Sequence, residues 1–191
     1  RDIIDMKPGR TEPYGDVSLK PFLANGEMQY QSNAHEAFHC LDIYYGPLLG
    51  RMNDEQLQSP EGLVLQHKEE VFADIGGVGE AMLAGYKDVA QHTADARSLD
   101  TYYYGSFIAR NEEKFCGERA GIEFNYSARA VEAFEKEVQK IGLNTYRAMT
   151  MAARRDLAHE ITEKFSLSAA ELDHVYQFNK QGSRYLENLA D

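Results

Sequence analysis

Most apolar side chains in this sequence recur at intervals of three and four residues, the spacing that places them on one face of an α-helix. Phe38, Leu41 and Tyr45 form one such stripe. The Ser-Asn pair before the stripe can cap the start of a helix, and the Gly-Pro pair after Tyr45 can end it. The pattern therefore predicts an amphipathic helix over residues 34–45.

A longer stripe follows the Ser59-Pro60 pair, whose residue types are typical of a helix start. It predicts a helix to about residue 85, with an apolar face made of Val64, Val71, Ile75, Val78 and Met82. Glycines at 76, 77 and 79 lie inside this helix, where each costs about 1 kcal/mol relative to alanine. We expect them to let this helix pack closely against the helix over 34–45.

The first part of the chain differs from the rest, because residues 1–31 show little periodicity. They predict a loop-rich start with one short strand, Glu27–Gln31, where side chains alternate and a turn signal precedes. Such a strand at an edge could pair with an extended peptide.

The second half predicts further helices. We expect a polar connection over 88–98 and then a helix from about Leu99. A helix over 128–141 is capped by Ser127 and ended by Gly142, and one or two helices follow over 143–165. A final helix runs to about Leu189 and is opened by the capping box Ser168-Ala-Ala-Glu171.

The predicted fold class is therefore mainly α, or α+β with minimal strand. We expect a single domain over 1–191. In it, 1–31 is the loop-rich start, 32–86 holds two helices that face each other, and 98–191 is a helical remainder. A length of 191 residues suffices for one domain with a substantial core.

The charge balance narrows the choice of partners. The net charge of −11 argues against nucleic acid and anionic membranes, which are themselves polyanions. No apolar run reaches the length of a transmembrane helix. Cys40 and Cys116 are either two buried free thiols or one disulfide. The start at Arg1 and the even cysteine count favour a periplasmic or secreted location, and the sequence gives no oligomeric state.

The predicted helix over 34–45 carries the pattern H-E-x-x-H, made of His35, Glu36 and His39. Two histidines four residues apart project from one face of a helix, one turn apart. They could therefore ligate one Zn²⁺ ion, while Glu36 could take a proton from water activated by that ion.

A catalytic zinc site needs a third protein ligand. The long predicted helix offers Glu70 and Asp74, which lie one turn apart on a face continued by Gly77 and Ala81. Glu69 and His67 are alternative ligands in the same region.

H-E-x-x-H followed by E-x-x-x-D resembles the gluzincin zinc metallopeptidases, and the resemblance covers residues 32–82. It implies a zincin-like helical domain in which His35, His39 and Glu70 hold Zn²⁺, Glu36 is the general base, and Asp74 orients a ligating histidine. It also implies a peptide or protein substrate cleaved by metal-activated water. A hydrogen bond from the second nitrogen of a ligating histidine to a carboxylate is what Asp74 would supply.

Other interpretations stay open at this point. The same residues could form a structural zinc site in a binding domain, closed by a fourth protein ligand such as His67. Glu36-x-x-His39 and Glu171-x-x-His174 could instead serve a di-iron carboxylate site, with Glu70 and Glu135 bridging. The residue that would stabilise an oxyanion is not determined, and the candidates are Tyr102, Tyr103, Tyr104, His92, His159 and His174.

Overall fold

The computed structural model describes residues 26–98 and 126–188. Its helices are α2 (Glu27–Leu41), α3 (Gly46–Leu49), α4 (Asp54–Leu57), α5 (Pro60–Ala84), a helix over 89–98, α7 (Ala128–Ile141), α8 (Leu143–Ala148), α9 (Met151–Phe165) and α10 (Ala169–Asn188). The described residues form no strand, which confirms the predicted mainly α fold class.

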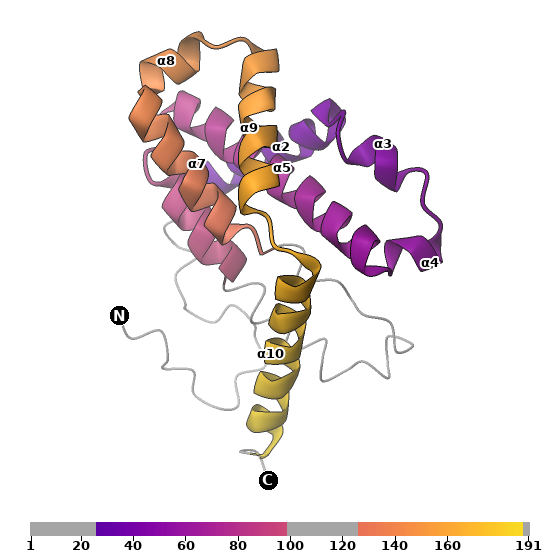
Figure 1. Cartoon of the computed structure of the whole chain (residues 1–191). Helices are drawn as coiled ribbons and strands as arrows, with labels where there is room; N and C mark the ends of the chain where they lie inside the picture. The colour runs from indigo at the N-terminus through magenta and orange to yellow at the C-terminus, as the bar shows by residue number, and fades with distance from the viewer. Residues whose placement is uncertain (1–25, 99–125, 189–191) are drawn as a thin grey trace.

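Helix α5 is the centre of the molecule (Figure 1). Helix α2 packs along one side of it, and α7 and α9 pack on another. The middle of the apolar stripe predicted for this helix is buried, because Val71, Ile75 and Val78 are 0% exposed, while Val64 and Met82 at its ends are half-buried. Val131 and Phe134 from α7 enter the same core.

Gly76 and Gly77 let α5 pack closely against α2, as predicted, whereas Gly79 lies against Tyr146 of α8. A Cβ atom at Gly77 would lie 2.9 Å from the carbonyl oxygen of Gln31 and 3.0 Å from the backbone nitrogen of His35. A Cβ atom at Gly76 would overlap the ring of Phe38, and one at Gly79 would overlap the hydroxyl of Tyr146. The three positions therefore have no room for any side chain.

The strand predicted over Glu27–Gln31 is wrong, because these residues form the first turns of α2. The helix begins after Gly26, whose φ of 68° is unfavourable for other residues, and Glu27 adds a favourable acid to the first turn. The contact between Gln31 and Gly77 holds these turns against α5. Tertiary packing therefore overrides the local alternation.

Helix α2 also ends earlier than predicted, at Leu41 instead of residue 45. The carboxylate of Asp42 accepts hydrogen bonds from the backbone N–H groups of Tyr44, Tyr45 and Gly46. This turn competes with continuation of the helix, as aspartate side chains commonly do.

The polar connection predicted over 88–98 is likewise wrong, because a helix occupies 89–98. Val89, Ala90 and Ala94 are buried in the core, and these apolar contacts help to hold this helix in place. The start predicted near Leu99, Tyr102–Tyr104 and Cys116 all lie outside the described residues.

Other predicted boundaries are confirmed. Ser59 caps α5, α7 starts after Ser127 and ends at Gly142, and Ser168 with Glu171 forms the capping box before α10. The Ser127 side chain, however, does not cap α7. Cys40 is exposed on α2, which contradicts the burial considered for it. No helix in the described ranges has the length and apolarity needed to cross a membrane.

We predict that Gly77→Ala lowers the free energy of unfolding by about 1–3 kcal/mol, although alanine improves helix propensity by about 1 kcal/mol. The added Cβ would press on backbone atoms of α2, which cannot rotate away. Urea denaturation measures the change. Gly50→Ala is the control, since a Cβ there meets its nearest atom at an ordinary 3.4 Å. A stabilised Gly77→Ala protein would show that the helices do not meet this closely.

Candidate metal centre

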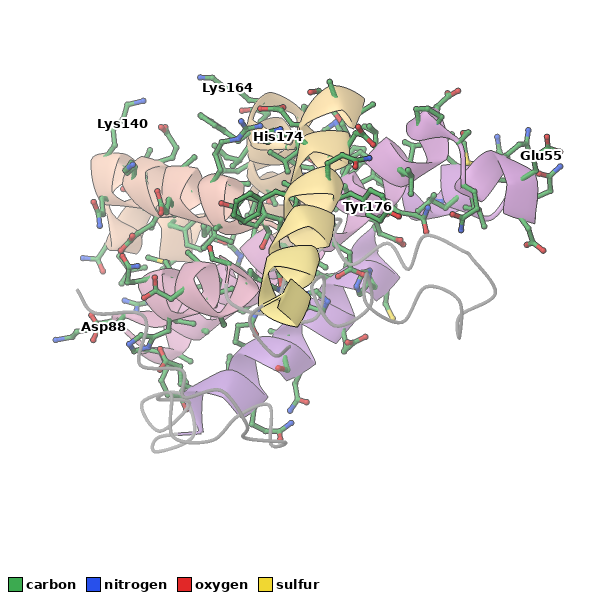
Figure 2. The ribbon with its side chains drawn as sticks, turned by 90° about the horizontal axis from the view of Figure 1, so that it is seen from below. Glu55, Asp88, Lys140, Lys164, His174 and Tyr176 are labelled. Atoms are coloured by element: carbon green, nitrogen blue, oxygen red, sulfur yellow. The ribbon has the colours of Figure 1, made fainter. Side chains whose placement is uncertain are left out.

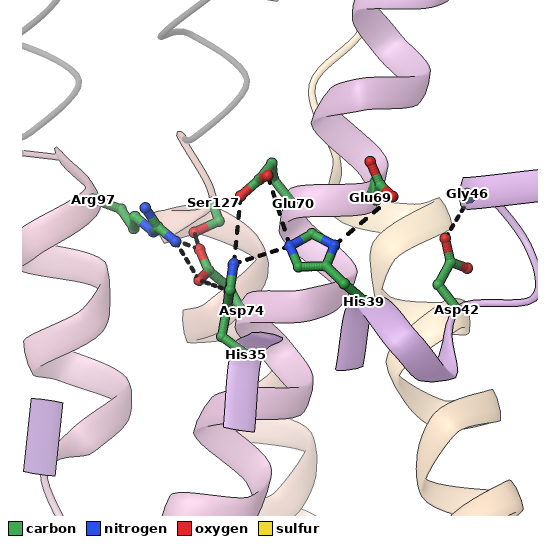
Figure 3. A network of polar contacts seen from close by, with 9 residues as sticks. All are labelled: His35, His39, Asp42, Gly46, Glu69, Glu70, Asp74, Arg97 and Ser127. Carbon is green, nitrogen blue, oxygen red and sulfur yellow. Dashed lines mark hydrogen bonds and ion pairs between the residues drawn. The ribbon is translucent and has the colours of Figure 1, made fainter. Parts of the chain in front are cut away.

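Side chains from α2 and α5 converge on one point (Figure 3). The Nε2 atoms of His35 and His39 are 3.1 Å apart. The Glu70 carboxylate faces both rings, with one oxygen 3.6 Å from His35 Nε2 and the other 3.8 Å from His39 Nε2. The structure therefore brings together the three residues that the H-E-x-x-H and E-x-x-x-D patterns single out.

These distances fit a metal ion. Zinc ligands at about 2.0–2.1 Å in a tetrahedral arrangement lie ~3.3 Å from one another. The separations of 3.1, 3.6 and 3.8 Å lie close to this value. Within the described parts of the chain, His35, His39 and Glu70 are the one group of three or more potential ligands whose donor atoms come this close. Their role as ligands stays a prediction.

Asp74 lies one turn beyond Glu70 and contacts the other side of the first histidine. Its Oδ1 atom is 2.8 Å from His35 Nδ1. An ionised carboxylate can only accept, so Nδ1 carries the hydrogen and donates it. A neutral imidazole in this tautomer presents the Nε2 lone pair toward His39 and Glu70, which is the form that binds a metal.

Asp74 is itself held by a network that sequence reasoning missed. The Arg97 guanidinium donates two hydrogen bonds to the Asp74 carboxylate, both 2.7 Å long, and the Ser127 hydroxyl donates a third of 2.5 Å. Burial opposes ionisation of this fully buried group, but the Arg97 charge and the hydrogen bonds from His35 and Arg97 hold the Asp74 pKa below its usual range. Asp74 is therefore charged and fixed.

The two alternative ligands lie elsewhere. The Glu69 carboxylate is 3.8 Å from His39 Nδ1, on the side of the ring away from Glu70, and it raises the pKa of His39. His67 is fully buried, and its Nε2 accepts a hydrogen bond of 2.8 Å from the backbone N–H of Leu167. Neither belongs to the converging group, so the geometry favours Glu70.

The converging group opens into a pocket of about 410 Å³. Its described lining consists of Gln31, Ser32, His35, Glu36, His39, Glu70 and Arg97. Glu36 is exposed and lines the same pocket as the two histidines. Burial raises the pKa of Glu70, an effect that Asp74 strengthens and that His35 and His39 oppose.

The three histidines named as possible oxyanion donors are not in the described lining of this pocket, and Tyr102, Tyr103 and Tyr104 lie outside the described residues. His92 is paired with Glu27 at 2.9 Å, and His159 stacks on Tyr44 with ring centroids 3.8 Å apart. His174 is exposed on α10 (Figure 2). Arg97, Gln31 and Ser32 line the pocket, and sequence reasoning assigned none of them to the site. A fully buried aspartate calls for a cationic partner, but only the fold identifies which residue supplies it.

The di-iron arrangement has no support in the described geometry. Glu171 caps α10 through Ser168 and pairs with Arg129 at 2.7 Å. Neither Glu171 nor His174 belongs to the group of residues that could hold a metal.

Comparisons with protein families, with characterised proteins and with solved structures gave no match to this chain.

We predict that Arg97→Met lowers the free energy of unfolding by about 3 kcal/mol, because it leaves the buried Asp74 charge without its cation. Adding Asp74→Asn should return part of this loss, since the uncompensated charge is removed. Chemical denaturation of both variants measures the effect. Arg51→Met, at an exposed position, is the control. A double variant that is less stable than Arg97→Met would contradict the charge-based explanation.

We predict that Glu70→Gln and Glu69→Gln weaken zinc binding to different extents. Glu70→Gln removes the charge of a ligand oxygen and should lower zinc affinity by more than about 100-fold. Glu69→Gln removes the charge beside His39 Nδ1 and should lower zinc affinity by about tenfold or less. Competition with a chromophoric chelator measures both constants. A larger loss of zinc affinity in Glu69→Gln than in Glu70→Gln would identify Glu69 as the third ligand.

Proposed function

We propose that this protein is a zinc-dependent hydrolase, most specifically a metallopeptidase. The observation that carries the proposal is the convergence of His35, His39 and Glu70 on one point of an open pocket, with Asp74 behind His35. The choice of zinc follows from two imidazoles and one carboxylate, the set found in many catalytic zinc sites.

The residues of the chain have separable tasks in this proposal. Zinc, when bound, acts as a Lewis acid that activates water and polarises a carbonyl group. Glu36 accepts the proton released during attack on the scissile carbonyl and transfers it to the leaving amine. Its exposure on the pocket side of α2 gives it access to both water and substrate.

Asp74 supports this chemistry indirectly. By accepting the Nδ1 hydrogen of His35, it fixes the ring orientation and keeps the Nε2 lone pair on the pocket side. Arg97 and Ser127 keep Asp74 in place and ionised. The network is assembled from α5, the helix over 89–98 and the start of α7, so three helices set the orientation of one ligand.

A structural zinc site in a binding domain is the competing interpretation. It requires a fourth protein ligand that closes the coordination sphere. Among the described residues, His67 faces Leu167, and the three donors open into the pocket. This supports the catalytic interpretation.

We predict that the zinc-loaded protein hydrolyses peptide bonds and that Glu36→Gln reduces turnover by about 10²–10⁴-fold while one zinc per chain is retained. The reason is that glutamine cannot accept the proton, although it leaves the three donors unchanged. Element analysis and a peptide cleavage assay give the two readouts. Glu55→Gln is the matched control, at an exposed position on α4 and outside the pocket (Figure 2).

Two outcomes would contradict the proposal. One is a wild-type protein that takes up no zinc. The other is a Glu36→Gln protein that keeps full peptidase activity, because proton transfer through Glu36 would then be unnecessary.

A further inference from the structure

The walls of the pocket next to the metal-ligand candidates are polar throughout the described lining. Apart from the three donors and Glu36, its residues are Gln31, Ser32 and Arg97. No apolar side chain contributes to the described lining, although zinc-site pockets that bind apolar groups need such walls. The residue types of the described lining therefore indicate which kind of substrate group the pocket binds.

Gln31 and Ser32 extend the donor face of α2 by one turn. Gln31 lies four residues before His35, and Ser32 lies four residues before Glu36, so all four share one side of the helix. The backbone of Gln31 packs on Gly77, which fixes this part of α2 relative to the donors. The backbone positions that carry an amide and a hydroxyl are thus fixed beside the three donors.

The charges in the pocket are close to balanced. Arg97 is neutralised by Asp74 at 2.7 Å. Glu36 and Glu70 add two negative charges, which a divalent cation would offset. The Gln31 and Ser32 wall consequently offers hydrogen bonds without a net charge, which suits a neutral polar group better than an ion.

The helical surroundings strengthen this conclusion. A strand over 27–31 could have bound a peptide backbone by pairing with it, but these residues are helical, so they present no strand edge to pair with. In the described pocket, recognition is left to side chains. An apolar substrate group would displace water from Gln31 and Ser32 and return no hydrogen bonds, which is unfavourable.

We propose that Gln31 and Ser32 are specificity residues that select a neutral hydrogen-bonding side chain, such as glutamine, asparagine, serine or threonine, next to the scissile bond. This inference rests on the proposed hydrolase function and specifies its substrate class.

The experiment uses the zinc-loaded full chain with two probes, glutamine hydroxamate and leucine hydroxamate. The hydroxamate group binds zinc in both, so the side chain alone differs. Titration calorimetry should show glutamine hydroxamate binding at least about tenfold more tightly, which corresponds to ~1.4 kcal/mol. In Gln31→Leu the preference should vanish or reverse, and Ser32→Ala should reduce it, while zinc affinity stays the same in both.

Gln29→Leu is the matched control, because the same substitution there lies on α2 at an exposed position outside the pocket lining. It should keep the wild-type preference. Equal or tighter binding of leucine hydroxamate by the wild type overturns the inference, as does binding of neither probe or loss of preference in Gln29→Leu.

The failure of the proposed function gives a different result. A protein that prefers glutamine hydroxamate but cleaves no peptide retains this pocket specificity and is not a peptidase. A peptidase that cleaves beside leucine at least as well as beside glutamine retains the function and lacks the specificity.

Discussion

Helices α2 and α5 come into backbone contact at Gly77, where Gln31 and His35 leave no space for a side chain. This contact sets the distance between the two helices, and with it the distance between the histidines of α2 and the carboxylate of α5. A side chain at this contact would force the two backbones apart by a few tenths of an ångström, which is comparable with the tolerance of about 0.2 Å in metal–ligand distances. The helix-propensity cost of the glycines is offset by the geometry that they permit.

The second constraint is the buried carboxylate of Asp74. A charge in a protein interior is unfavourable unless cations and hydrogen bonds surround it, and here Arg97, Ser127 and His35 do so. Such a network contributes little to stability compared with apolar packing, but it fixes the orientation of each member. The network thereby sets the orientation of the His35 ring, and with it the position of Nε2, which is one of the three converging donor atoms.

Sequence patterns predicted the elements whose apolar spacing is long and regular. The start and the buried face of α5, the start and end of α7, and the capping box of α10 are all as expected. The predictions for two short segments were wrong. Residues 27–31 and 89–98 have weak periodicity, and their helical state follows from tertiary packing. Residues 27–31 pack against Gly77 of α5, and the helix over 89–98 enters the core through Val89 and Ala94.

The sequence by itself determined which residues could form the donor set. A spacing of four residues brings side chains to one face of a helix, so H-E-x-x-H and E-x-x-x-D each indicate a pair of neighbouring side chains once they lie on helices. It also identified Asp74 as the partner of a histidine, through a resemblance. It left Glu69, His67 and Glu70 as alternatives, since neighbouring residues on one helix differ only in direction. The tertiary structure decided that only Glu70 faces both rings, and that Arg97 and Ser127 surround Asp74. Those contacts join residues far apart in the chain, and their partners are set by how helices pack, which no local spacing encodes.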